Sequence, residues 1–131
     1  MKRLLFIGPL SGTSRQRQLA FGRSGYEVDV IDPRKKLPPT ILFDAIEWHL
    51  TPALLSWRVF HSIEKQLLGT ERNFYDIAFV DGGSLINAKT VDLLKKYSKS
   101  VVAFNHDDPF GPRDWIRFGV FRKAVYHYDL E

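Results

Sequence analysis

The chain contains no cysteine among its 131 residues. Disulfide bonds, zinc–thiolate sites and thiol catalysis are therefore excluded. Proteins of reducing compartments rarely depend on disulfides, so this absence is compatible with a cytoplasmic protein. Long apolar runs are missing as well, because no segment approaches the roughly 20 apolar residues that a membrane-spanning helix needs. We therefore expect a cytoplasmic protein without a membrane span.

The sequence also lacks a concentrated basic segment. Lysine and arginine number 19 against 15 acidic residues, which gives a formal net charge of +4 at pH 7. These basic residues are scattered along the chain, whereas a nucleic-acid-binding domain usually gathers them on one face. We therefore expect no nucleic-acid partner. A cleft that attracts a phosphorylated ligand accounts equally well for the mild excess of positive charge.

The composition that is present is typical of an ordinary globular domain. Hydrophobic residues make up 44% of the chain and charged residues 26%, as in most soluble domains. A chain of this length can bury a substantial core and falls within the usual size of one domain. We expect residues 1–131 to form a single domain.

Short apolar runs alternate with segments of helical character. Such runs are typical of parallel strands that are covered on both faces. Strands are expected over residues 3–8, 26–32, 75–83, 100–105 and 124–129, and helices over 14–24, 52–68 and 88–97. Residues 40–50 suit a short helix or an irregular segment, and residues 113–123 suit a helix. The order predicts an α/β fold with an open, parallel, Rossmann-like sheet of about five strands and helices on both faces.

Capping residues indicate where two of these helices begin and end. Ser14 is the expected N-cap of the first helix, and Gly25 follows its end. Thr51 and Pro52 form a typical helix start, and Gly69 follows the end of that second helix.

Three polar or glycine-rich loops follow strands of the predicted sheet. In open parallel sheets, ligands bind outside the carboxyl ends of the strands. The loops at this edge are residues 8–14, 81–85 and 105–110. Their shared position is the strongest indication of a functional site that pattern alone provides.

The first loop, "GPLSGTS" at residues 8–14, combines two glycines with three hydroxyl side chains. Backbone N–H groups at the start of the following helix can bind an anion, and small residues let it approach. The spacing matches neither a Walker loop nor the dinucleotide GxGxxG pattern. Two interpretations remain open: a contact with a phosphate or sugar, and a tight turn whose glycines satisfy steric needs alone.

The second loop, "VDGGSL" at residues 80–85, places Asp81 at the end of the third strand. Receiver domains carry a phosphoacceptor aspartate at this position, but they also require an acidic pair after the first strand. Gly8 and Pro9 stand there instead, which argues against a receiver. The glycine pair either makes room for a ligand or turns the chain.

The third loop, "NHDDPF" at residues 105–110, admits three interpretations. A metal site is the least favoured, because adjacent side chains point in different directions and no distant ligands are evident. A turn is plausible because Asp108 precedes Pro109, which fixes its own φ. A catalytic role is equally open, because His106 or a neighbouring aspartate could take a proton from a hydroxyl nucleophile, and histidine is the residue type whose unperturbed pKa suits this task.

Three stretches of the chain resemble one family. They are "LLFIGPLSGTSRQRQLAFGRSGYEVDVID", "YDIAFVDGGSLINAKTVDLLKK" and "VVAFNHDDPF". Their order and spacing are similar to those in the N-terminal part of the glycosyltransferases described as CgeB-like spore maturation proteins. The resemblance implies a bacterial protein of GT-B architecture, in which two Rossmann-like domains enclose the active site.

The resemblance also implies a reaction and roles for individual residues. The reaction is transfer of a sugar from a nucleotide-sugar donor, used as co-substrate, to a hydroxyl acceptor, with no bound cofactor or metal. The N-terminal domain forms the acceptor side. The residues that would face the donor phosphates or the acceptor are Gly8, Gly12, Thr13 and Ser14. The residues that would line the cleft are Asp81, Gly82 and Gly83. The candidate bases would be His106, Asp107 and Asp108.

The family's chains normally continue into a second, donor-binding domain, whereas this sequence stops just after the expected fifth strand. We therefore expect the chain alone to be inactive and to work with a C-terminal domain or as a homodimer. The alternative hypothesis is a non-catalytic Rossmann-like module for binding or dimerisation.

Overall fold

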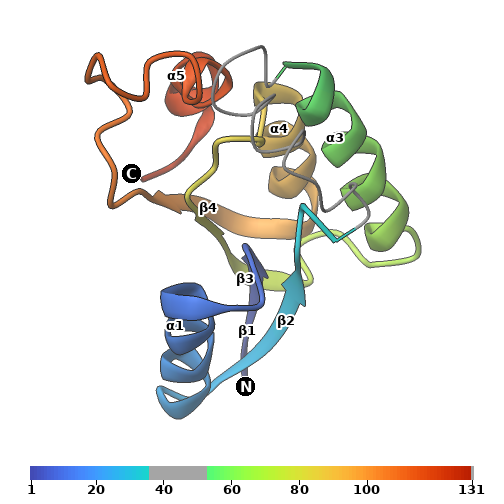
Figure 1. Ribbon diagram of the computed structural model, residues 1–131. Helices are drawn as coiled ribbons and strands as arrows, with labels where there is room; N and C mark the ends of the chain where they lie inside the picture. Colours follow the sequence, from blue (N-terminus) through green and yellow to red (C-terminus); the bar gives the residue numbers. More distant parts are fainter. Residues whose placement is uncertain (36–52, 131) are drawn as a thin grey trace.

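The computed structural model describes residues 1–35 and 53–130 of the chain. Its centre is a parallel sheet with the strand order β2-β1-β3-β4 (Figure 1). The strands are β1 (Lys2–Ile7), β2 (Tyr26–Ile31), β3 (Tyr75–Asp81) and β4 (Ser98–Phe104). Because all four run in the same direction, their carboxyl ends share one edge of the sheet.

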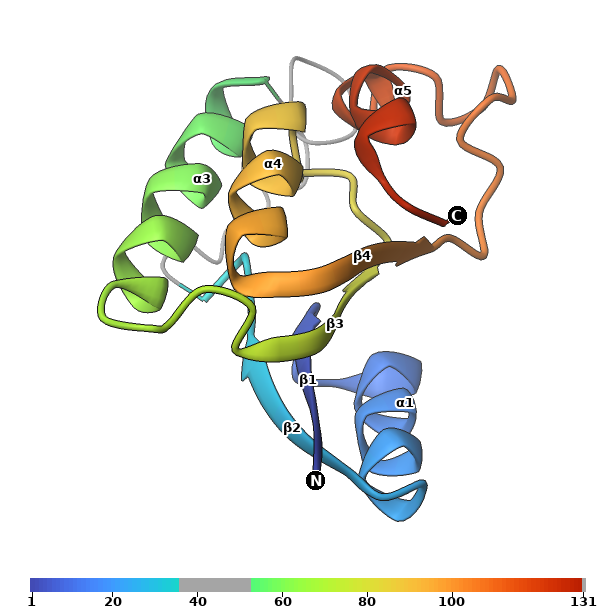
Figure 2. The same cartoon turned by 180° about the vertical axis from the view of Figure 1, so that it is seen from behind.

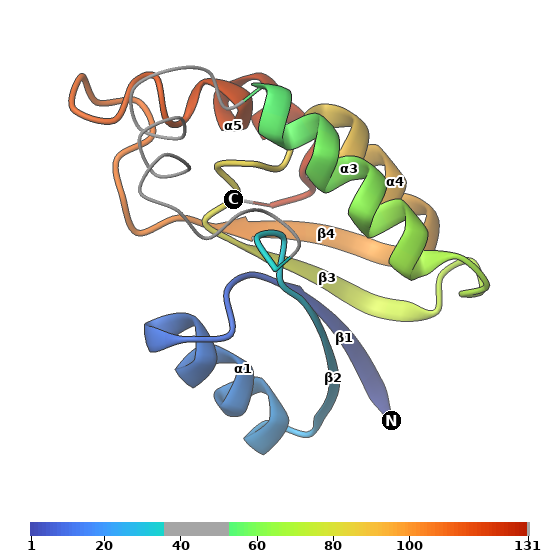
Figure 3. The ribbon, with the colours of Figure 1, turned by 45° about the vertical axis from the view of Figure 1, so that its right-hand side comes forward.

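Helices cover both faces of this sheet. Of the described helices, α1 (Gly12–Arg23) lies on one face, and α3 (Ala53–Leu67), α4 (Ala88–Tyr97) and α5 (Gly119–Ala124) lie on the other (Figures 1, 2 and 3). This arrangement confirms the predicted α/β fold with an open, parallel, Rossmann-like sheet, although the described sheet has four strands where about five were expected. Within the described ranges, no helix has the length and apolarity to cross a membrane.

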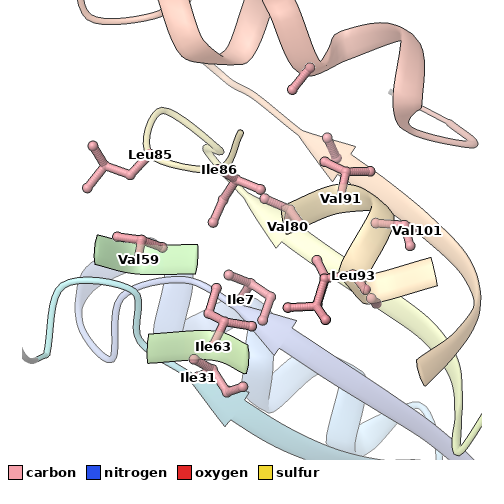
Figure 4. Packing of buried hydrophobic residues seen from close by; sticks show 14 of the residues in the cluster. Ile7, Ile31, Val59, Ile63, Val80, Leu85, Ile86, Val91, Leu93 and Val101 are labelled. Atoms are coloured by element: carbon pink, nitrogen blue, oxygen red, sulfur yellow. The ribbon is translucent and has the colours of Figure 1, made fainter. Parts of the chain in front are cut away.

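The main core lies between the sheet and the three-helix layer. Alternate strand residues such as Ile7, Val80 and Val101 belong to one buried cluster with residues of this layer, including Val59 and Ile63 of α3 and Val91 of α4 (Figure 4). Residues of opposite parity, such as Phe6, are also fully buried. Burial on both faces explains why β1 is a continuous apolar run.

The predicted strand over residues 124–129 is wrong. Ala124 ends α5, and a 3-10 helix (Val125–His127) follows it directly. The buried residues Phe121, Ala124 and Tyr128 are spaced three and four apart, which is the period of a helix rather than a strand. Strand-like hydrogen bonds to β4 are made only by Asp129 and Leu130, and Leu130 forms a parallel bridge with Val102.

The first helix begins earlier than its predicted cap. Ser11, with extended backbone angles, occupies the N-cap position, and Ser14 lies inside the first turn. Gly25 follows the helix end with a φ of 92°, as expected for a residue that terminates a helix. Thr51, Pro52 and the predictions for residues 40–50 lie outside the described residues.

Candidate functional site

The three strand-end loops meet around one cavity of about 270 Å³. Every predicted loop contributes to its wall, as expected when parallel strands end at a common edge. The predicted residues that line the cavity are Gly12, Thr13, Ser14, Asp81, Gly82, Gly83, His106 and Asp107. The topology therefore assembles, from positions up to about 95 residues apart, most of the residues that pattern and resemblance had singled out.

Gly8 lies beneath the cavity and allows β1, α1 and β3 to approach closely. A Cβ atom at this position would lie 2.7 Å from Cε1 of Phe6, 3.0 Å from Oγ of Ser14 and 3.1 Å from Cβ of Asp81. Any larger residue would therefore push apart the groups that form the cavity floor. These short distances support the interpretation that Gly8 meets a steric need, and Gly8 is not among the residues that line the cavity.

The amino end of α1 opens into the cavity through Gly12, Thr13 and Ser14. Gly12 has a φ of 59°, a left-handed value that suits glycine. The Ser11 side chain makes no capping hydrogen bond, so the N–H groups of the first turn keep their donor capacity. The Ser14 residue is only 4% exposed, and within the described part of the chain its hydroxyl has no hydrogen-bond partner.

Asp81 forms an ion pair with Arg17 at the base of the cavity. The Nη1 atom of Arg17 lies 2.8 Å and 3.1 Å from the two carboxylate oxygens of Asp81. The Asp81 side chain is 4% exposed, so this arginine compensates a charge that water hardly reaches. The Arg17 guanidinium also lies 4.6 Å from the ring centroid of Phe104, and this cation–π contact helps to orient the guanidinium.

The glycine pair after β3 turns the chain around the cavity. Gly82 and Gly83 both have positive φ, at 91° and 72°. A Cβ atom on Gly83 would lie 3.1 Å from the Phe121 ring. The backbone at Gly82 is tied to the third loop, because its N–H donates to the Phe104 carbonyl and its carbonyl accepts from Asn105 Nδ2. These glycines therefore both turn the chain and hold two loops together.

His106 and Asp107 present different chemistry to the cavity. His106 is exposed and lines the cavity wall. Asp107 is engaged: its Oδ2 atom lies 3.2 Å from Nη1 of Arg117, and its Oδ1 atom lies 3.7 Å from Nη2 of Arg113. The Asp107 carboxylate is therefore occupied by arginine partners, whereas the His106 ring is exposed at the cavity wall.

Asp108 is exposed, and it is absent from the residues that line the cavity. Its Oδ1 atom accepts a hydrogen bond from the Phe110 N–H, and its carbonyl accepts one from the Gly111 N–H. This is the geometry of a local turn, so the turn interpretation describes Asp108 and Pro109 well.

The site contains functional side chains that the sequence did not single out. Arg17, Arg34 and Arg117 all line the cavity. Arg17 and its partner Asp81 are 64 positions apart in the chain, and no local sequence pattern links them. A buried acidic residue at a strand end was the one available sign that a basic partner was needed.

Within residues 1–35 and 53–130, no three histidine or acidic side chains cluster in a way that could hold a metal ion. No family model, curated protein or solved structure matches this chain.

Proposed function

We propose that this domain forms the acceptor side of a GT-B glycosyltransferase and helps to transfer a sugar from a nucleotide-sugar donor to a hydroxyl acceptor. The observation that supports this proposal is the single cavity at the carboxyl edge of the sheet. It brings together a helix amino end, small hydroxyl residues and an exposed histidine. A helix amino end favours anionic groups, and an imidazole can accept a proton from an alcohol.

His106 is the preferred base among the three candidates. It lines the cavity and is exposed, so a bound hydroxyl can reach its ring. Asp107 is held by Arg117 and Arg113, and Asp108 belongs to a turn outside the cavity. The Asp107–Arg117 pair then has a positioning role, because it ties the His106 loop to the segment that precedes α5.

The Arg17–Asp81 pair and Gly8 supply the rigid floor on which this chemistry depends. Catalysis by a positioned base requires the acceptor to be held within hydrogen-bond reach of that base. Loops that are tied to the ends of buried strands provide this rigidity. The proposal requires a donor-binding domain opposite the cavity, because GT-B enzymes enclose the active site between two Rossmann-like domains.

A second candidate function, a non-catalytic association module, is supported by a different surface. Among the helices that the structure describes, only α1 lies on its face of the sheet, and Phe104 remains 41% exposed. Beside α1 lies a shallow apolar groove of about 230 Å³, lined by Arg17, Ala20, Phe21, Ser24, Phe79 and Phe104. Exposed apolar surface of this kind is common where another polypeptide packs.

The proposal is tested by nucleotide-sugar turnover in the full-length gene product that contains this domain, with a panel of sugar donors. We expect His106→Ala to lower kcat by about 100-fold or more, as is typical when a general base is removed. Asp108→Asn should leave turnover nearly unchanged, and Asp107→Asn should have an intermediate effect through positioning. Equal turnover in the His106→Ala variant and the parent protein would remove the base assignment. The absence of turnover with every donor would favour the association module.

A further inference from the structure

We infer that the outer edge of β2 is a docking site for an extended segment of another polypeptide, which adds to the sheet as a further strand beside α1. The segment carries an apolar–basic–apolar triplet at its centre. This inference does not depend on the proposed function, because no residue of β2 lines the strand-end cavity.

The two edges of the described sheet differ. At the β4 edge, the Ala103 N–H donates to the Leu130 carbonyl at 2.9 Å, and the Asp129 N–H donates to the Val101 carbonyl at 2.8 Å. At the opposite edge, β2 pairs with β1 and with no other described strand (Figure 1). It is six residues long and contains no proline. Native proteins usually cover or interrupt such an edge, because its backbone groups recruit another strand.

The backbone groups of Tyr26, Val28 and Val30 face away from the sheet. The Ile31 carbonyl accepts a hydrogen bond from the Gly8 N–H on the β1 side. Backbone groups alternate in direction along a strand, so the residues with the parity of Ile31 bond toward β1 and the residues between them point outward. No described residue outside the sheet bonds to these outward groups. They therefore provide the donors and acceptors that an added strand needs.

A groove of about 480 Å³ lies beside this edge, between β2 and α1. It is lined on the β2 side by Tyr26, Val28 and Val30, and on the α1 side by residues that include Leu19 and Gly22. Leu19 is 44% exposed, so it offers apolar surface to side chains of an added strand. A Cβ atom on Gly22 would meet nothing within 4 Å, so packing within the chain does not require a glycine there. In strand addition, backbone hydrogen bonds supply affinity and such grooves select alternate side chains.

Charge on the other face of β2 defines the chemistry of the partner. The Asp29 carboxylate accepts a hydrogen bond from the Tyr75 hydroxyl at 2.9 Å, and within the described part of the chain no basic side chain pairs with it. Its neighbour Glu27 lies 3.6 Å from Nε of Arg3. A basic side chain directly across from Asp29 would form a cross-strand pair of opposite charge.

The residues on either side of that basic residue would enter the groove, because side chains alternate between the two faces of a strand. The groove is apolar where Val28 and Val30 line it, so these two residues are expected to be apolar. The resulting apolar–basic–apolar pattern reads the same in both directions and therefore suits an added strand of either orientation.

The same charges argue against a second copy of this chain as the occupant. If β2 paired with the β2 strand of another copy in the antiparallel register centred on Val28, Glu27 would lie opposite Asp29. In the register centred on Asp29, the two copies of this carboxylate would face each other. Like charges directly opposite each other in neighbouring strands are destabilising. The charges therefore favour a different polypeptide with a basic residue at this position.

Chemical-shift titration of the ¹⁵N-labelled chain with the peptide acetyl-Thr-Thr-Val-Lys-Val-Thr-Thr-amide tests this inference. The peptide combines the triplet with residues that favour strands. We expect saturable shifts at Tyr26, Val28 and Val30 and slower exchange of their amide hydrogens, because these N–H groups become bonded. The amides of Glu27 and Asp29, which already bond toward β1, should change less. The same peptide with glutamate in place of lysine should bind about fivefold more weakly.

Variants of the chain separate the groove from the charge. Gly22→Leu should abolish measurable binding, because the new side chain occupies the groove. Gln66→Leu, which adds apolar bulk to an exposed position of α3, is its control. Asp29→Asn keeps an acceptor for Tyr75 and should bring the two peptides to within about twofold in affinity. Asp92→Asn on α4 should keep the fivefold preference, and thermal unfolding verifies that each variant is folded.

N-methylation of the peptide tests for strand addition itself. Methyl groups placed on the valines or on the lysine should abolish binding in one of the two cases, since only alternate N–H groups point toward β2. The inference is overturned if the lysine peptide causes no saturable shifts, if both methylated peptides bind like the parent peptide, or if the glutamate peptide binds as tightly. Equal losses in the control variants would also overturn it. Protection of the same amides without peptide, increasing with chain concentration, would assign the edge to a second copy and contradict the inference.

Discussion

Arg17 of α1 and Asp81 of β3 form the ion pair that supports the strand-end cavity. The guanidinium nitrogen lies 2.8 Å from the nearer carboxylate oxygen, and the Asp81 side chain is 4% exposed. Because α1 contributes the helix amino end and β3 contributes the glycine turn, this pair fixes the distance between two walls of the site. Its strength should therefore affect both stability and ligand binding.

Arg17→Gln should lower the free energy of unfolding by about 2 kcal/mol, because it leaves the Asp81 carboxylate buried without a charged partner. The estimate lies below the roughly 3–5 kcal/mol of fully buried pairs, since the Arg17 side chain is 27% exposed. Urea denaturation measures the change. Arg15→Gln on the same helix is the control, and equal losses in the two variants would show that the pair does not carry the effect.

Gly8→Ala should destabilise the chain by about 1–3 kcal/mol, since overpacked sites shift their neighbours. The new methyl group would meet Phe6, Ser14 and Asp81 at 2.7–3.1 Å. Gly22→Ala is the matched control, because its methyl group would meet nothing within 4 Å and alanine favours a helix interior by up to about 1 kcal/mol. Thermal unfolding of the two variants should therefore shift in opposite directions. A Gly8→Ala protein as stable as the parent would disprove the tight packing.

Asp76 should make stability depend on pH in the acid range. The hydrogen bonds from Lys99 Nζ at 2.6 Å and from the Arg3 N–H at 2.9 Å lower the pKa of the Asp76 carboxyl. A carboxyl with a lower pKa in the folded state stabilises the protein above its unfolded pKa, near 3.9, and loses this contribution as pH falls through the folded pKa. The parent chain should therefore be more stable than Asp76→Asn at pH 6, and the gap should close toward pH 2.

Urea midpoints of both proteins across this pH range provide the measurement. A gap between the parent chain and Asp76→Asn that stays constant from pH 6 to pH 2 would contradict the assignment, since neutral asparagine cannot reproduce a titrating carboxylate.

His106→Gln should lower kcat for sugar transfer by about 100-fold while leaving KM for the acceptor within about twofold of the parent. Glutamine retains hydrogen-bonding capacity but cannot act as a general base, so the chemical step should lose more than acceptor binding does. Steady-state kinetics of both proteins separate the two effects. Loss of binding in step with loss of turnover would assign His106 to substrate binding instead.

The sheet and the edge at which its strand-end loops gather were predictable because the apolar runs end sharply. The apolar run from Leu4 to Ile7 ends at Gly8, and the apolar run of β3 ends at Asp81, just before Gly82 and Gly83. Both the strands and the loops after them could therefore be located. Parallel order then placed the loops at one edge, which the cavity confirms. The predicted N-cap Ser14 was wrong because Ser11, an equally good capping residue, occupies that position three residues earlier.

Other features depended on tertiary contacts. The segment after α5 contains Val125 and Tyr126, which favour strands, but the burial of Phe121, Ala124 and Tyr128 against the core imposed a helical turn. The pairing of Arg17 with Asp81 spans 64 positions, and only the βαβ crossovers bring these residues together. For the same reason, the sequence did not separate Asp107 from Asp108, which the structure assigns to an ion-pair network and a turn.

The most direct test of the central claim, that the strand-end cavity is the functional site, is an amide chemical-shift titration of the ¹⁵N-labelled chain with a panel of nucleotide-sugars and hexoses. The account predicts saturable shifts at Gly12, Thr13, Ser14, Gly82, Gly83 and His106, which line the cavity. The amides of Val28 and Val30, which line a separate groove between α1 and β2, should stay unchanged. Shifts confined to that groove, or no shifts at any residue, would contradict it.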